Sequence, residues 1–171
     1  AGRPTVAVLF FVSVLAQAVE RAWHFPTDIL PRLTQAGCNA GKCHGAATGQ
    51  GGFKLSLFGD DPAADHAAIT REDGARRIDL DRPERSLVLR KPSRQLGHKG
   101  GQKLRADSEP WRAVRDWIAA GVPFGNTELH VIRLEVTPAN FLPAGEGQAV
   151  QLKVMAYFSD AHVRDVTGMS L

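Results

Sequence analysis

The sequence is poor in cysteine, with Cys38 and Cys43 as the only two among 171 residues. A structural zinc site usually takes two ligand pairs, and a second pair at similar spacing is missing. The sequence also lacks internal repeats and low-complexity tracts. The net charge is only +3. Arginines alternate with acidic residues over residues 76–85, which is typical of a solvated mixed-charge face and not of a nucleic-acid interface. We therefore predict a globular chain with no nucleic-acid partner.

A hydrophobic segment stands near the N-terminus. Residues 5–16 read TVAVLFFVSVLA, Arg3 precedes them, and the A-x-A-like sequence Ala16-Gln17-Ala18 follows. This pattern predicts a signal peptide over residues 1–18 and export to the periplasm or the cell surface. The segment is too short for a comfortable membrane span of about 20 residues. An uncleaved N-terminal anchor and a buried element of the fold stay open as alternatives.

The two cysteines are close together and a histidine follows them, in Cys38-Asn-Ala-Gly-Lys-Cys43-His44. A Cys-His pair after an upstream cysteine is the arrangement that attaches haem covalently, with two thioethers and a proximal histidine on the iron. The usual spacer between the thiols has two residues, whereas this spacer has four. We predict covalent haem c at Cys38, Cys43 and His44.

Two other interpretations of the cysteine motif stay open. A Cys38–Cys43 disulfide would close a small loop, which export permits, but it leaves His44 without a role. Such a chain would be a non-haem cell-surface interaction protein. A zinc site matches the spacing between the cysteines, but Cys43 and His44 would then have to bind one small tetrahedral ion from adjacent positions.

Methionine is absent between Cys43 and Gly121, although it is the common partner of histidine on the iron of cytochromes c. The histidines of this region are His66, which we assign to packing or the surface of a helix, and His98. Three glycines surround His98 in Leu-Gly-His-Lys-Gly-Gly, so the backbone there can approach a flat cofactor closely. We predict His98 as the distal iron ligand and a bis-histidine site. A solvent-exposed loop histidine, with an open iron site as in a sensor or peroxidase, is the alternative.

The periodicity changes near residue 125. Over residues 27–121, caps and prolines predict short helices that begin near Thr27, Pro62, Pro83 and Ser108, with Gly-rich loops between them. From residue 131, apolar and polar residues alternate and predict strands, with a hairpin turn at 159–162. We expect a mainly α-helical cytochrome c-like domain over residues 19–124. It is followed, over 125–171, by the first strands of an incomplete β-sandwich with an exposed edge.

A set of short segments stands in a specific order and spacing: 28–34, 37–45, 51–57, 68–71, 86–92, 98–101, 117–121, 159–160 and 164–167. These segments resemble one family: large exported planctomycete proteins with an N-terminal cytochrome c-like domain followed by a bacterial Ig-like (group 2) domain. The resemblance implies haem binding at Cys38, Cys43 and His44, electron transfer, and an Ig-like β-sandwich.

Electron transfer by an exported haem c module of a larger protein is the function that the sequence predicts. No arrangement of residues indicates substrate chemistry, so we expect an electron-transfer module and not an enzyme. The expected partners are a redox protein that the sequence does not identify and, for the Ig-like segment, other domains. We expect no membrane span beyond the N-terminal segment.

Overall fold

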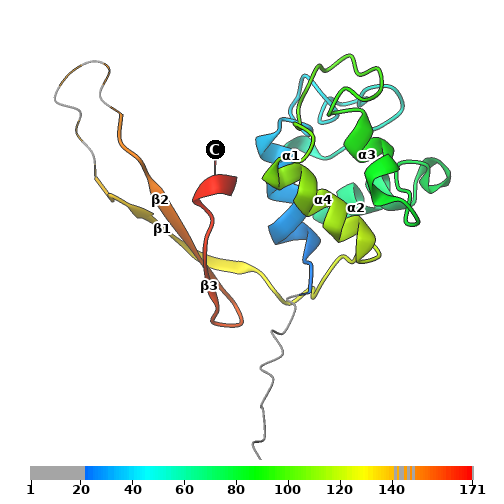
Figure 1. Cartoon of the computed structure of the whole chain (residues 1–171). Coiled ribbons are helices and arrows are strands. Elements are labelled where there is room, and N and C mark those ends of the chain that lie inside the picture. The colour runs from blue at the N-terminus through cyan, green and yellow to red at the C-terminus, as the bar shows by residue number, and fades with distance from the viewer. Residues whose placement is uncertain (1–21, 141, 143–144, 146, 148, 171) are drawn as a thin grey trace, which may run out of the picture.

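The computed structural model describes residues 22–140, 142, 145, 147 and 149–170. The predicted signal peptide therefore lies outside the described residues. Figure 1 shows two parts: a group of short helices and loops, and an elongated antiparallel sheet beside it. None of the helices in the described ranges is long and apolar enough to cross a membrane.

The helical part contains four short α-helices, and proline stands in the first turn of three of them. Proline suits this position because its missing N–H has no partner in a helix anyway. A turn of π-helix, η1 (Phe25–Ile29), leads directly into the first helix. The α-helices are α1 (Leu30–Gln35), α2 (Pro62–Thr70), α3 (Leu87–Arg90) and α4 (Glu109–Ala119).

The predicted helix starts are confirmed for the two longest helices. The Asp61 side chain accepts a hydrogen bond from the Ala64 backbone N–H and caps α2, and Ser108 is the N-cap residue of α4. The helix predicted to begin at Pro83 is instead a short 3-10 turn, η4 (Pro83–Arg85), followed by the single turn of α3. Ser86 separates the two in an extended conformation.

Aromatic and branched side chains from η1, α1 and α4 form the core. Phe25, Ile29 and Trp117 are all 0 % exposed, and the Trp117 indole N–H donates to the Pro123 carbonyl at 2.9 Å. Burying side chains of this size contributes about 1.5–3 kcal/mol each, so the core holds the short helices together. The core side chains that α4 contributes are Trp111, Val114, Trp117 and Ile118.

The sheet has three antiparallel strands in the order β1 (Val131–Thr137), β2 (Lys153–Phe158) and β3 (Val163–Asp165). The predicted hairpin turn lies between β2 and β3, where the Ala161 N–H donates to the Phe158 carbonyl at 3.0 Å. In β2, alternate residues are buried, whereas every residue of β1 is exposed.

The sheet joins the helical part at η1 and α1. The Arg164 guanidinium forms an ion pair with the buried Asp28 carboxylate and donates to the Thr27 carbonyl at 2.8 Å. Arg32 of α1 donates to the Met169 sulfur at 2.9 Å. Both arginines therefore link segments more than 130 residues apart in the sequence.

The predicted fold class is wrong. In place of a mainly α cytochrome c-like domain and the start of a β-sandwich, the chain is a small mixed fold of short helices and one three-stranded sheet. The helices are only 4 to 11 residues long, because prolines and glycines begin and end them at close intervals. Alternation in β1 predicted a buried face, but in the described part of the chain no second layer covers that strand.

Candidate functional site

The cysteine motif forms a compact loop directly after α1. Cys38 N–H donates to the Leu33 carbonyl at 2.9 Å, and His44 N–H closes the loop by donating to the Cys38 carbonyl at 3.0 Å. Gly45 follows, and a Cβ at this position would lie 2.0 Å from the Asn39 carbonyl oxygen. The four-residue spacer therefore makes a hydrogen-bonded turn that brings both thiols and His44 together, and the turn requires glycine at its end.

Both cysteines are free thiols and half-buried. Burial, and next the negative charge that Cys43 would carry, raise the pKa of Cys38 to about 12, while Lys103 acts in the opposite direction. Cys38 is therefore a protonated thiol at neutral pH and a weak spontaneous nucleophile.

His44 is oriented by the loop that follows it. Its ring Nδ1 lies 2.9 Å from the Phe53 carbonyl oxygen, and the two rings pack with centroids 4.5 Å apart. A carbonyl oxygen can only accept, so Nδ1 carries the proton and Nε2 keeps its lone pair. Burial lowers the pKa of His44 below 6.5, against the Phe53 carbonyl, which raises it. The imidazole is therefore neutral at neutral pH and able to bind a metal through Nε2.

His98 is held in the same way in the loop that follows α3. Its Nδ1 lies 2.8 Å from the Gly101 carbonyl oxygen, so its Nε2 also keeps the lone pair. A Cβ at Gly100 would lie 3.0 Å from the imidazole, which explains why a glycine stands beside it.

The fold brings His44 and His98 together. They are 54 residues apart in the sequence, yet their ring centroids are 6.3 Å apart and the ring planes differ by only 24°. Figure 1 shows the loop after α1 and the loop after α3 side by side at one end of the helical part. Of the predicted site residues, Cys38, Cys43 and His44 share one loop, and His98 faces that loop from the second.

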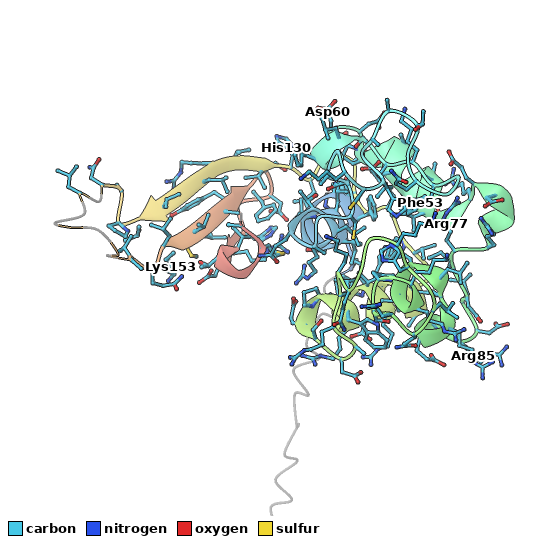
Figure 2. All side chains as sticks on the ribbon, turned by 90° about the horizontal axis from the view of Figure 1, so that it is seen from above. Phe53, Asp60, Arg77, Arg85, His130 and Lys153 are labelled. Atoms are coloured by element: carbon cyan, nitrogen blue, oxygen red, sulfur yellow. The ribbon has the colours of Figure 1, made fainter. Side chains whose placement is uncertain are left out.

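Sequence reasoning missed Arg77, which belongs to this site. It was assigned to a solvated face, but it is only 5 % exposed. Its guanidinium lies 4.5 Å from the Phe53 ring centroid (Figure 2) and donates to the Gly52 carbonyl at 3.2 Å. It also donates to the Ala68 carbonyl at 3.0 Å. Arg77 thus supports the ring and the backbone that orient His44, and its place in a charge-rich run gave no signal of this.

The two other histidines of the helical part, His24 and His66, have structural roles. His66 is 7 % exposed, its Nε2 lies 2.8 Å from the Val122 carbonyl oxygen, and it packs edge-on against Phe25 and Phe124. His24 is 3 % exposed, and its Nδ1 lies 2.8 Å from the Thr27 hydroxyl. His66 is a core residue and not a surface one.

Two further observations concern the site. Within the described ranges, no group of three or more His, Cys, Asp or Glu side chains is arranged to hold a metal ion. Comparison of the chain with protein-family models, curated proteins and solved structures finds no match.

Proposed function

We propose that this chain binds haem c covalently through Cys38 and Cys43, with His44 and His98 as the two axial iron ligands, and that it transfers electrons. The pairing of His44 and His98 carries the proposal. The resemblance to exported planctomycete proteins with a cytochrome-like segment supports it. Because bacterial haem c is attached outside the cytoplasm, the proposal includes export to the periplasm or the cell surface.

The distance between the two imidazoles fits one metal ion between them. Two metal–nitrogen bonds of about 2 Å and two ring radii of about 1 Å add up to about 6 Å between centroids, and the centroids are 6.3 Å apart. His44 and His98 would supply two imidazole ligands to a haem iron, and Cys38 and Cys43 would hold the haem covalently. The donor set of the chain therefore fits a haem.

The backbone carbonyls around the site suit both histidines to this role. Metal-binding histidines usually donate their second ring N–H to a carbonyl or carboxylate, which sets the ring orientation and makes the ligand more basic. The Phe53 and Gly101 carbonyls are the acceptors here. When bound, the haem supplies a one-electron couple between ferric and ferrous iron. Two imidazoles favour a lower potential than a histidine–methionine pair.

The proposal is tested by producing the chain with a c-type haem maturation system and recording a reduced pyridine haemochrome spectrum. We expect a covalent haem band that is lost in the double variant Cys38→Ser/Cys43→Ser. A protein without this band, with its two cysteines oxidised to each other, would end the haem proposal and support the disulfide.

The distal ligand is tested separately with His98→Ala. We expect the low-spin ferric spectrum to become high-spin and the ferrous protein to bind CO rapidly. The exposed His130, on the sheet side of the molecule, provides the control, and His130→Ala is expected to leave the spectrum unchanged. An unchanged low-spin spectrum in His98→Ala would rule out His98.

A further inference from the structure

The charges of this chain are divided unevenly along the sequence. Residues 29–59 and 86–106 carry all the proposed haem-binding residues, and they contain nine Lys and Arg but not one Asp or Glu. The rest of the chain holds the other twelve basic residues and all eighteen acidic ones. The mild net charge of +3 is therefore the sum of a cationic region and an acidic remainder.

Most cations of these two segments have no acidic partner. Arg32 pairs with Glu109 at 2.5 Å, but in the described part of the chain the other eight side chains form no ion pair. Seven of these eight are exposed and Arg90 is half-buried. We call them the cationic face: Lys42, Lys54, Arg90, Lys91, Arg94, Lys99, Lys103 and Arg105.

Three members of the cationic face lie beside the residues of the proposed haem site. Lys42 precedes Cys43 and Lys99 follows His98 in the sequence. The Lys103 ammonium would lie 3.9 Å from a Cβ at Gly37, so it stands at the start of the cysteine loop. Because the two loops meet at the His44–His98 pair, their unpaired cations gather at the same end of the molecule.

A small apolar area lies among these charges. Leu57 is 49 % exposed, and its side chain lies 3.8 Å from the Cβ position of Gly41, inside the cysteine loop. A small apolar area within a charged surface is common in protein–protein interfaces, where the core is apolar and the rim is polar.

We propose that the cationic face docks the acidic surface of a protein that exchanges electrons with this chain. The inference rests on the proposed function, because an electron partner must approach the iron and cations of this face stand beside the proposed iron ligands. The propionates of one haem carry only two negative charges and leave most of the cations unpaired. A nucleic acid would meet few stacking surfaces here, since Phe58 is the one exposed aromatic side chain of residues 29–59 and residues 86–106 contain no Phe, Tyr or Trp.

The test uses the haem-loaded protein and a defined probe, a short oligo-glutamate peptide, with single-stranded DNA and anionic lipid vesicles as comparison probes. We expect the peptide to bind at low ionic strength and to slow the oxidation of the reduced protein by hexacyanoferrate(III). Both effects should weaken steeply as salt is added, because exposed charges are screened over about 10 Å at 0.1 M salt.

A matched pair of charge-reversal variants separates the cationic face from net charge. Lys42→Glu/Lys99→Glu/Lys103→Glu should weaken peptide binding and slow the hexacyanoferrate reaction by about tenfold or more. Arg82→Glu/Arg85→Glu/Lys153→Glu changes the net charge equally at positions away from the site; Figure 2 shows Arg85 and Lys153 at opposite ends of the molecule. This control should change either quantity less than about twofold. Equal effects of the two variants would overturn the proposal.

The remaining outcomes also decide. Tighter binding of DNA or vesicles than of the peptide would overturn the assignment to an acidic protein. The Lys→Gln versions of the three face substitutions repeat the test if the Glu versions do not fold. Haem content is measured in every sample. If the haem-loaded protein does not bind the peptide, this inference alone is overturned. If the protein carries no haem, the proposed function is overturned as well.

Discussion

The helical part of the molecule, residues 22–124, and the sheet of β1–β3 differ in how far their apolar side chains are buried. Phe25, Ile29 and Trp117 of the helical part are completely buried, whereas Ile132 and Leu134 of β1 are 63 % and 59 % exposed. The first part has a closed core, whereas the sheet buries only alternate residues of β2, such as Phe158, and is linked to the helical part by Arg164. The paired histidines His44 and His98 lie on the part with the closed core.

Within the helical part, the proposed haem loops, like the sheet, depend more on backbone hydrogen bonds than the core does. They are rich in glycine and turns, and backbone hydrogen bonds hold them. Two side chains link them to α2: Arg77 donates to the Ala68 carbonyl, and the buried Asp65 carboxylate accepts from the backbone N–H and the hydroxyl of Ser56. The candidate site is therefore built from glycine-rich turns that hydrogen bonds to neighbouring residues hold in place.

Removing a core ring should give the largest difference between the two parts. We expect Trp117→Ala to lower the free energy of unfolding by about 3–5 kcal/mol, because Trp117 is completely buried and the cavity cannot close fully. Ile132→Ala, in the exposed strand β1, should change it by less than about 0.5 kcal/mol. Urea unfolding followed by circular dichroism measures both. Equal effects would show that the sheet is as tightly packed as the helical part.

Substitution of Arg77 should destabilise the loop that orients His44. We expect Arg77→Met to cost about 3 kcal/mol, because it leaves buried carbonyls without donors. The neighbouring Arg76 is exposed and pairs with Asp73 at the surface, so Arg76→Met should cost less than about 1 kcal/mol. Urea unfolding gives the free energies. The absorption spectrum of the haem-loaded variants shows whether His44 ligation changes; similar results for both would contradict the role of Arg77.

Breaking the link between the two parts should uncouple their unfolding. Arg164→Met is expected to cost about 1.5–3 kcal/mol, because a charged group loses its hydrogen bonds to the Asp28 carboxylate and the Thr27 carbonyl. All three tryptophans lie in the helical part and the single tyrosine, Tyr157, lies in β2. Fluorescence of the two residue types therefore reports the two parts separately.

We expect the tyrosine transition to move to lower denaturant than the tryptophan transition in Arg164→Met. The variant Lys153→Met, at an exposed position of β2, should leave the two transitions together. Coincident transitions in both variants would show that other contacts hold the sheet.

A methyl group at the end of the cysteine loop should disturb the site more than the core. We expect Gly45→Ala to cost about 1–3 kcal/mol, because its Cβ would overlap the Asn39 carbonyl. It should also reduce the fraction of protein that carries haem. A Cβ at Gly168, outside the haem loops, meets nothing within 4 Å, so Gly168→Ala serves as the control. The haemochrome yield per protein distinguishes the two, and equal yields would contradict this account of the loop.

The smallest expected effect concerns pH. Burial, together with the charge of Arg71 and against the hydrogen bond to the Val122 carbonyl, lowers the pKa of His66 below 6.5. Below pH 6.5 the folded protein therefore binds fewer protons at His66 than the unfolded chain does. The free energy of unfolding consequently decreases as the pH is lowered from 6.5 to the pKa of His66 in the folded protein. His66→Gln should weaken this decline, whereas His130→Gln, at an exposed position, should preserve it. Urea unfolding between pH 7 and pH 5 measures the difference.

Local patterns predicted the elements that depend on neighbouring residues. Pro62 marked the start of α2, Ser108 marked the start of α4, and the alternation of residues marked the strands. The fold class failed because packing between elements is not local. The alternation in β1 indicated a buried face, but in the described residues nothing lies on it. The charge run around Arg77 indicated a solvated surface, but the guanidinium is buried over Phe53.

The sequence by itself determined the chemistry that is available at the site: two thiols and an imidazole on one loop, and a second imidazole among glycines. The short spacing along the chain keeps the two thiols and the first imidazole on one loop, because residues so close in sequence cannot move far apart. Only the tertiary structure decided that His98 faces His44, that Arg77 supports the ring beside it, and that the acid-free segments meet at one end. These relations join residues far apart in sequence, and they depend on how the core packs the short helices together.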